Sequence, residues 1–302
     1  MTILYNLKIF ERHYYVITLL TILIVFVPIS DYFRQMINDA TVTSLPASTE
    51  ATLSLTTDPL IPGNIIACTE SGLLTANAGE ASAIAGGELN GGEIFDEIRG
   101  IAPTSATEFI VSDFNNRCLK LVHHCTGTVE EFSGTCEFAN RGPVGMQRDI
   151  NNGDQILFVQ DNNVMAVNIN DASFTVFAEG NFTTGVLLTG ITQKQDGDIH
   201  VTDTNSIWRI SCGDRQFSPI TLQQPQFNYL YDLVFIDDHT LLVADHFDSK
   251  LRLVDLSAGT VTSVDACRGA VASICCPTSL LLTDNALYVG YLRDSVQKFT
   301  CE

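Results

Sequence analysis

The chain has 302 residues, of which 45% are hydrophobic, 17% are charged and 21 are glycine. This composition excludes an intrinsically disordered chain, which is poorer in apolar residues and richer in charge. Acidic residues outnumber basic ones by 35 to 16, and the formal net charge of −19 disfavours a nucleic-acid partner because the surface repels phosphate backbones.

An apolar run from Tyr14 to Ile29 contains no charged side chain and follows Lys8 and Arg12. The sequence after it, SDYFRQ, is bulky and charged, unlike the small residues of a signal-peptide cleavage site. We therefore predict an uncleaved transmembrane signal anchor at 14–30, with a short cytoplasmic segment at 1–13. The rest of the chain is then extracellular, as in a single-pass type II membrane protein. Secretion after signal cleavage is the alternative.

Residues 31–60 are rich in Thr, Ser and Ala and are expected to form a flexible stalk. All nine cysteines follow the apolar run, which in an exported protein indicates several disulfides with at least one cysteine left over. Asn181 begins an Asn-Phe-Thr glycosylation sequon, consistent with a glycoprotein.

A fourteen-residue phrase recurs in the remaining segment, 61–302. It reads FIVSDFNNRCLKLV at 109–122 and LLVADHFDSKLRLV at 241–254, and weaker copies start at 157, 199 and 287. The aspartate of the phrase falls at Asp113, Asp161, Asp203 and Asp245, and the fifth copy has Tyr291. These positions are 48, 42, 42 and 46 residues apart, a period typical of propellers or solenoids.

Each period contains four short runs rich in β-branched and aromatic residues, separated by turn residues, which predicts four antiparallel strands. The sequence therefore predicts an all-β chain, a β-propeller of four-stranded blades. Five blades are counted, and six are the alternative. The last copy lacks a fourth strand, so we expect an N-terminal strand at 81–86 to close the ring by pairing with 296–300.

The repeated aspartates lie between the second and third strand of each blade. An aspartate in a tight connection accepts backbone N–H bonds, so Asp113, Asp161, Asp203 and Asp245 are predicted to be structural turn residues.

The strand, the Asp-x-x-Asn turn, the CLKLV strand and the following GTV..F.G stretch resemble the NHL-repeat family of β-propellers over about 80–302. The resemblance implies the fold and leaves the activity open, since NHL-like propellers include RNA-binding modules, cell-surface interaction domains and a few metal-dependent lyases.

The anchor, stalk and cysteines favour a non-enzymatic extracellular binding module with a protein or glycan ligand and no cofactor. The alternative is a metal-dependent lyase or lactonase-like enzyme. Its ligands would come from the central channel, and the candidate metal-binding residues are His200, Asp203, Asp245 and His246.

Two disulfides are predicted. Cys118 and Cys136 are equally distant from Gly127 at the centre of an expected hairpin, so they should face each other. Cys125 is the competing partner for Cys136. Cys68 is expected to join Cys301 across the ring closure, and Cys267 and Cys275 are further candidates.

Overall fold

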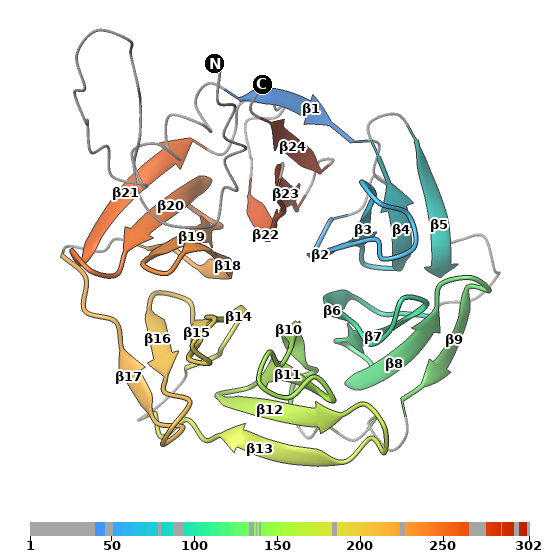
Figure 1. Cartoon of the computed structure of the whole chain (residues 1–302), viewed down its shortest axis with the longest axis horizontal. Coiled ribbons are helices and arrows are strands. Elements are labelled where there is room, and N and C mark those ends of the chain that lie inside the picture. The colour runs from blue at the N-terminus through green and yellow to red at the C-terminus, as the bar shows by residue number, and fades with distance from the viewer. Residues whose placement is uncertain are drawn as a thin grey trace, which may run out of the picture.

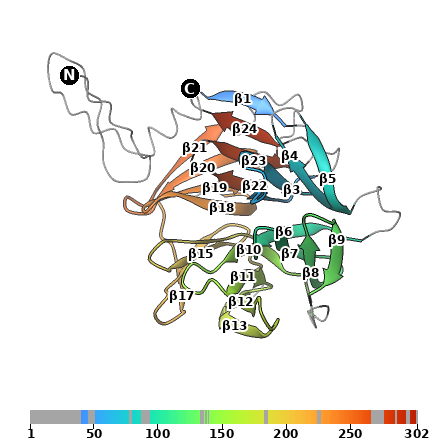
Figure 2. The ribbon, with the colours of Figure 1, turned by 45° about the vertical axis from the view of Figure 1, so that its right-hand side comes forward.

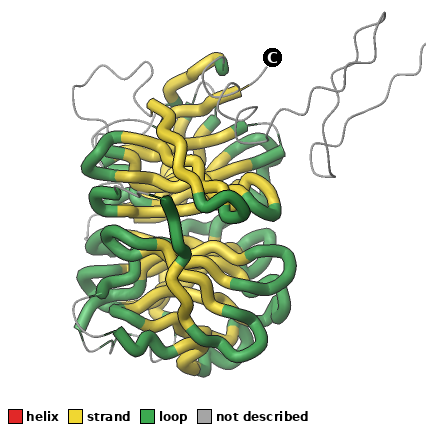
Figure 3. Tube along the Cα trace, turned by 90° about the vertical axis from the view of Figure 1, so that its left-hand side faces the viewer, coloured by secondary structure: helices red, strands yellow, loops and turns green. Residues whose placement is uncertain are grey.

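The described part of the chain consists of strands joined by loops. The computed structural model describes residues 40–45, 51–77, 80–86, 94–132, 136, 138, 140–182, 186–223, 227–265, 276–284, 286–292 and 296–300. Its strands form six four-stranded antiparallel sheets arranged as blades around a central axis (Figure 1). The described chain contains no helix (Figure 3), and therefore none long and apolar enough to span a membrane. The predicted anchor at 14–30 lies outside the described residues.

The blades are numbered 1 to 6 in chain order, and each is given below from its first, innermost strand to its fourth, outermost strand. Blade 1 comprises β2 (Ser54–Thr57), β3 (Ile65–Cys68), β4 (Gly72–Ala76) and β5 (Ala81–Gly86). Blade 2 comprises β6 (Ile98–Pro103), β7 (Glu108–Asp113), β8 (Cys118–His123) and β9 (Thr128–Glu131). Blade 3 comprises β10 (Val144–Arg148), β11 (Gln155–Gln160), β12 (Asn163–Asn168) and β13 (Phe174–Ala178). Blade 4 comprises β14 (Ile191–Gln193), β15 (Ile199–Thr202), β16 (Ile207–Ile210) and β17 (Phe217–Pro219). Blade 5 comprises β18 (Leu230–Asp237), β19 (Thr240–Asp245), β20 (Lys250–Asp255) and β21 (Thr260–Asp265). Blade 6 comprises β22 (Pro277–Leu282), β23 (Leu287–Tyr291), β24 (Gln297–Thr300) and β1 (Thr41–Ser44).

The count of five blades is wrong, because residues 54–86 form a complete blade. Its first strand, β2, is the four-residue segment SLTT with one apolar side chain, Leu55, so composition does not distinguish it from a linker. The segment 81–86 is β5, the outer strand of blade 1, paired with β4 from Gly72↔Gly86 to Ala76↔Ala81. It therefore does not close the ring.

An N-terminal strand does close the ring, but that strand is β1. It pairs antiparallel with β24 from Thr41↔Thr300 to Ser44↔Gln297 and supplies the outer strand of blade 6 (Figures 1 and 2). The backbone N–H of Leu45 then donates to Val296 at 2.8 Å. β1 and β2 both lie within 31–60, so the stalk expected there is corrected: residues 40–45 and 51–60 belong to the propeller.

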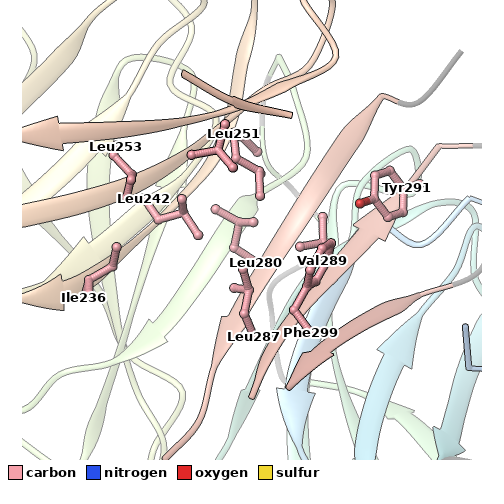
Figure 4. Packing of buried hydrophobic residues seen from close by; sticks show 11 residues of the cluster. Ile236, Leu242, Leu251, Leu253, Leu280, Leu287, Val289, Tyr291 and Phe299 are labelled. Atoms are coloured by element: carbon pink, nitrogen blue, oxygen red, sulfur yellow. The ribbon is translucent and has the colours of Figure 1, made fainter. Parts of the chain in front are cut away.

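The hydrophobic core lies between neighbouring blades. Figure 4 shows the cluster between blades 5 and 6, where Leu242, Leu251 and Leu253 face Leu280 and Phe299. Full burial of such a side chain stabilises the fold by about 1.5–3 kcal/mol. Further clusters follow around the ring, so each blade has apolar contacts on both of its faces.

The Cys118–Cys136 disulfide is confirmed, with Cα atoms 4.2 Å apart. The register behind the prediction is wrong, however. β8 and β9 pair from Lys120↔Glu131 to His123↔Thr128, which places the centre of the hairpin between Cys125 and Thr126 rather than at Gly127. Cys136 therefore reaches Cys118 from beyond the end of β9.

Replacing Cys118 and Cys136 together by serine is expected to lower the free energy of unfolding by about 3 kcal/mol. The bond closes a loop with a sequence separation of 18, and loops of that length lose about this much when opened. Urea unfolding measures the loss, and non-reducing peptide mapping should recover both cysteines in one linked fragment. Cys125→Ser removes an exposed free thiol and should change stability by less than about 0.5 kcal/mol.

Cys68 is a free thiol in β3, buried in the core between blades 1 and 2. Burial raises its pKa above the ordinary range of a thiol. The Cys68 side chain lies on the face of β3 that packs against blade 2, whereas Ile65 and Ala67 on the opposite face of β3 pack toward the closure, so the reasoning that linked Cys68 to Cys301 is corrected. Cys267, Cys275 and Cys301 lie outside the described residues.

Candidate functional site

The aspartate of the best two copies of the repeated phrase ties together three parts of its blade. In blade 5, Asp245 accepts the backbone N–H of Asn228 at 2.9 Å and the Nε and Nη2 groups of Arg252, each at 2.7 Å. In blade 2, Asp113 accepts the N–H of Asp96 at 2.8 Å and pairs with Lys120 at 2.5 Å. Both carboxylates are fully buried.

These contacts fix the residue that precedes the first strand of the blade. Glu97 and Tyr229 hold equivalent positions and have positive φ angles of 69° and 67°. Their carbonyl groups accept the backbone N–H groups of Phe114 at 2.9 Å and His246 at 3.0 Å. Positive φ is unusual for a bulky side chain and is maintained only where surrounding contacts impose it.

The other copies have the same placement with different partners. Asp203 accepts the backbone N–H groups of Asn205 and Ser206 and the indole N–H of Trp208. Asp161 accepts from Asn140 and has a φ of 53°. Tyr291, in the fifth copy, donates its hydroxyl hydrogen to Gln297.

A cavity of about 200 Å³ occupies the central channel. The first strands of all six blades line it, so it belongs to the ring as a whole. Its wall combines apolar side chains from β2, β10, β14, β18 and β22 with hydroxyl and amide groups, among them Ser54, Gln147, Thr189, Thr192 and Thr278.

We call the turn face the side of the propeller that carries the loops between second and third strands, such as 114–117 and 246–249. Four residues of the cavity lining lie at this end of the channel. Arg99 and Tyr231 are each the second residue of a first strand, whereas Tyr229 directly precedes β18 and Arg141 lies three residues before β10. We call the opening that these four residues line the mouth of the channel.

Two arginines at the mouth share one aromatic ring. The guanidinium carbon of Arg99 lies 3.8 Å from the ring centroid of Phe114, and that of Arg141 lies 5.2 Å from it. Arg99 also donates through Nε (2.7 Å) and Nη2 (2.5 Å) to Oε1 of Glu97. Arg141 has no ion pair with any residue in the described ranges.

Tyr231 lines the same cavity as Arg99 from the opposite side of the ring, because blades 2 and 5 lie opposite each other (Figure 1). Burial raises the pKa of its phenol to about 12, against the opposing effect of the nearby Arg99. Asp232, the next residue of β18, also lines the cavity. Burial raises the pKa of this carboxyl to about 6, although the backbone N–H groups of Leu280 (2.9 Å) and Leu233 (2.8 Å) donate to it.

Four aromatic rings adjoin the mouth. The Tyr229 ring is 5.1 Å from Phe247 and 6.2 Å from Tyr231, and the His246 ring is 4.9 Å from Phe247. Phe247 is 60% exposed, the largest exposed fraction among the large hydrophobic side chains of the described residues. We call Tyr229, Tyr231, His246 and Phe247 the aromatic cluster.

The four candidate metal-binding residues have other surroundings. Asp203 and Asp245 hold the turns described above. His200 is buried edge-on against Phe235, with ring centroids 5.0 Å apart, and burial lowers its pKa to about 4. His246 contacts the carbonyl of Pro277 through Nδ1 at 3.2 Å, and burial lowers its pKa. Within the described ranges, no three His, Cys, Asp or Glu side chains are grouped to hold a metal ion.

The residues at the mouth were missed because they carry no motif of their own. The signal was nevertheless present, since Arg99 precedes the Asp113 turn at the same distance as Tyr231 precedes the Asp245 turn. The sequon residue Asn181 is exposed, and residue 183, which completes the sequon, lies outside the described ranges.

No protein-family model matches the sequence, and no curated protein matches it either. Membership of the NHL-repeat family is therefore not shown. Solved structures do match. A protein of unknown function from Bacteroides thetaiotaomicron has a TM-score of 0.67 and 13% identity, with coverage of 87% of this chain and 72% of the other. The fold is a six-bladed β-propeller.

Two further similar structures carry functional names. Catalytically inactive virginiamycin B lyase from Staphylococcus aureus, with quinupristin, has a TM-score of 0.63 and 12% identity, covering 87% of this chain and 100% of the other. An auxiliary nutrient binding protein from Bacteroides thetaiotaomicron has a TM-score of 0.63 and 13% identity, covering 83% and 69%. At such low identity the likeness establishes the propeller fold alone.

Proposed function

We propose that this propeller is an extracellular binding module, tethered by the segment 14–30, that accepts a group of its ligand at the mouth of the channel. The observation that carries this proposal is the cavity, whose wall is built from all six blades and whose mouth has two arginines and two tyrosines. Pockets that combine apolar walls with a few convergent polar groups are typical ligand sites.

The exposed ring of Phe247 supports the same location, because arginine and aromatic side chains dominate the binding energy of many recognition surfaces. Similar structures include a nutrient binding protein, the extracellular domain of a two-component system and a nidogen–laminin complex. A propeller that binds an extracellular protein or glycan is consistent with these neighbours.

The proposal is tested by screening the purified full chain, in detergent, against arrays of extracellular proteins and glycans. Phe247→Asp changes the rim of the mouth and Ser54→Phe fills the channel. Each substitution should lower the affinity for the ligand at least tenfold. Ile150→Asp is the matched control, because Ile150 is 51% exposed in the loop after β10, on the opposite face. Equal binding by all three variants would place the ligand elsewhere and refute the proposal.

The metal-dependent enzyme is not proposed, since the described residues give it no ligand set. Stoichiometric zinc or calcium in the purified chain, measured by mass spectrometry with and without chelator, would favour it instead.

A further inference from the structure

The inference concerns the kind of ligand group that the mouth of the channel receives, and it rests on the proposed function. Arg141 brings a positive charge to the cavity wall without an ion pair in the described part of the chain, and Arg99 lies on the same Phe114 ring. The chain as a whole has a formal net charge of −19, so two adjacent arginines make the mouth a local site of positive charge on an acidic protein.

The negative groups nearby are largely engaged. Glu97 accepts from Arg99 through Oε1 and from Asn115 through Oε2 (3.1 Å), while Asp96 accepts from Asn115 at 2.9 Å. Among the described residues, the planar donor fork of Arg141 has no ion-pair partner and is available to a ligand, as are the N–H groups of Arg99 that do not contact Glu97. A guanidinium fork binds a carboxylate with two parallel hydrogen bonds, as it also binds a phosphate, so an anionic group of the ligand matches Arg141.

The aromatic cluster selects a second feature of the ligand. The face of an aromatic ring is electron-rich and attracts the polarised C–H groups of a sugar ring. Tyr229 lines the same cavity as the two arginines, and Phe247, which is 60% exposed, packs against the Tyr229 ring at 5.1 Å, so both rings are present on the turn face. A cavity of about 200 Å³ is below the usual range of about 300–1,000 Å³ for drug-sized ligands and suits a single ring.

The channel wall provides partners for several hydroxyl groups. Asp232 accepts two backbone N–H bonds, and Gln147 accepts the N–H of Gln193 through Oε1. With respect to the described residues, Asp232 retains further lone pairs and Gln147 retains its amide hydrogens. Thr192 and Ser54 add hydroxyl groups to the same wall. An acidic amino-acid side chain has a carboxylate but no hydroxyl groups to match these partners.

We propose that the mouth of the channel binds a carboxylate-bearing sugar at the end or along the chain of an acidic glycan. The carboxylate lies against Arg141 and Arg99, one face of the sugar ring packs on the aromatic cluster, and its hydroxyl groups turn toward Asp232 and Gln147.

The test compares small probes with the full chain in detergent by NMR titration. Methyl β-glucuronide and methyl β-glucoside differ only at C6, which is a carboxylate in the first and a hydroxymethyl group in the second. The methyl glycoside of N-acetylneuraminic acid provides a second acidic sugar. Acetyl-glutamate amide represents an acidic protein segment. At least one acidic sugar should bind about tenfold or more tightly than the glucoside and than the glutamate probe.

Arg141→Gln should abolish that preference, and Arg141→Lys should retain part of it. Arg215→Gln is the matched control, because Arg215 also lies on a phenylalanine ring (Phe177, 4.4 Å) but belongs to the loop between β16 and β17 on the opposite face. It should leave the preference unchanged. Circular dichroism of each variant confirms that the fold is intact.

Three results would overturn the inference: equal binding of glucuronide and glucoside together with no gain for N-acetylneuraminic acid, tighter binding of acetyl-glutamate amide, or a preference that survives Arg141→Gln. If the arrays still yield a ligand that Phe247→Asp weakens, the proposed function stands and only the acidic-sugar inference fails. If Phe247→Asp and Ser54→Phe leave every ligand unaffected, both fail.

Discussion

Replacing Arg252 with alanine is expected to lower the free energy of unfolding by about 3–5 kcal/mol, because the substitution leaves a buried carboxylate without its counter-ion. Arg252 is only 9% exposed and Asp245 is fully buried. Arg252 also donates to Asp248 at 2.5 Å and to the hydroxyl group of Ser263. Urea unfolding followed by fluorescence measures the loss.

Arg209→Ala is the control for this substitution. Arg209 pairs with Asp198 at 2.5 Å, and although Asp198 is buried, Arg209 is 50% exposed and the backbone N–H of Cys212 still donates to Asp198 at 3.0 Å, so its removal should cost less than that of Arg252. Comparable losses for the two variants would contradict the structural role assigned to Asp245. The double variant Asp245→Ala/Arg252→Ala should recover part of the loss, since it removes the isolated charge.

Replacing Leu45 with alanine is expected to cost about 2–5 kcal/mol, the usual range for a buried leucine that leaves a cavity. Leu45 directly follows β1, is 1% exposed and packs with Ile65, Ala67 and Tyr288 between blades 6 and 1. The packing that is lost lies between blades 6 and 1, where the ring closes. The whole propeller should therefore unfold at a lower temperature in a single transition.

Leu60→Ala provides the comparison, because Leu60 is 37% exposed and its truncation should change stability by less than about 0.5 kcal/mol. Calorimetry of both variants distinguishes the closure from a general effect of losing a leucine. A wild-type transition temperature for Leu45→Ala would show that β1 does not hold the ring.

The blade pattern was predictable where both partners of a strand pair are close in the sequence. The phrases at 109–122 and 241–254 form β7–β8 and β19–β20, because each contains two apolar strands and the turn between them. β1 was not predictable in this way. It has four residues, TVTS, and its partner β24 is more than 250 residues away, so no local pattern identifies the pair.

The candidate site was less predictable than the fold. Asp113 and Asp245 stand out in the sequence because they recur, yet they stabilise turns rather than face a ligand. Arg99, Arg141 and Tyr231 become a group only when six first strands converge on one axis. Their proximity therefore depends on the number of blades, which the sequence analysis counted incorrectly.

The pairing of β1 with β24 places residue 41 directly beside residue 300. The covalent chain is therefore interrupted within blade 6, while the backbone hydrogen-bond ladder of that blade continues across the interruption. The six blades share one strand order, so the break between residues 300 and 41 is a matter of connectivity and not of architecture. A circularly permuted propeller, with residue 300 joined to residue 41 by a short linker and new ends in an exposed loop such as 211–216, would retain every blade and the same central channel.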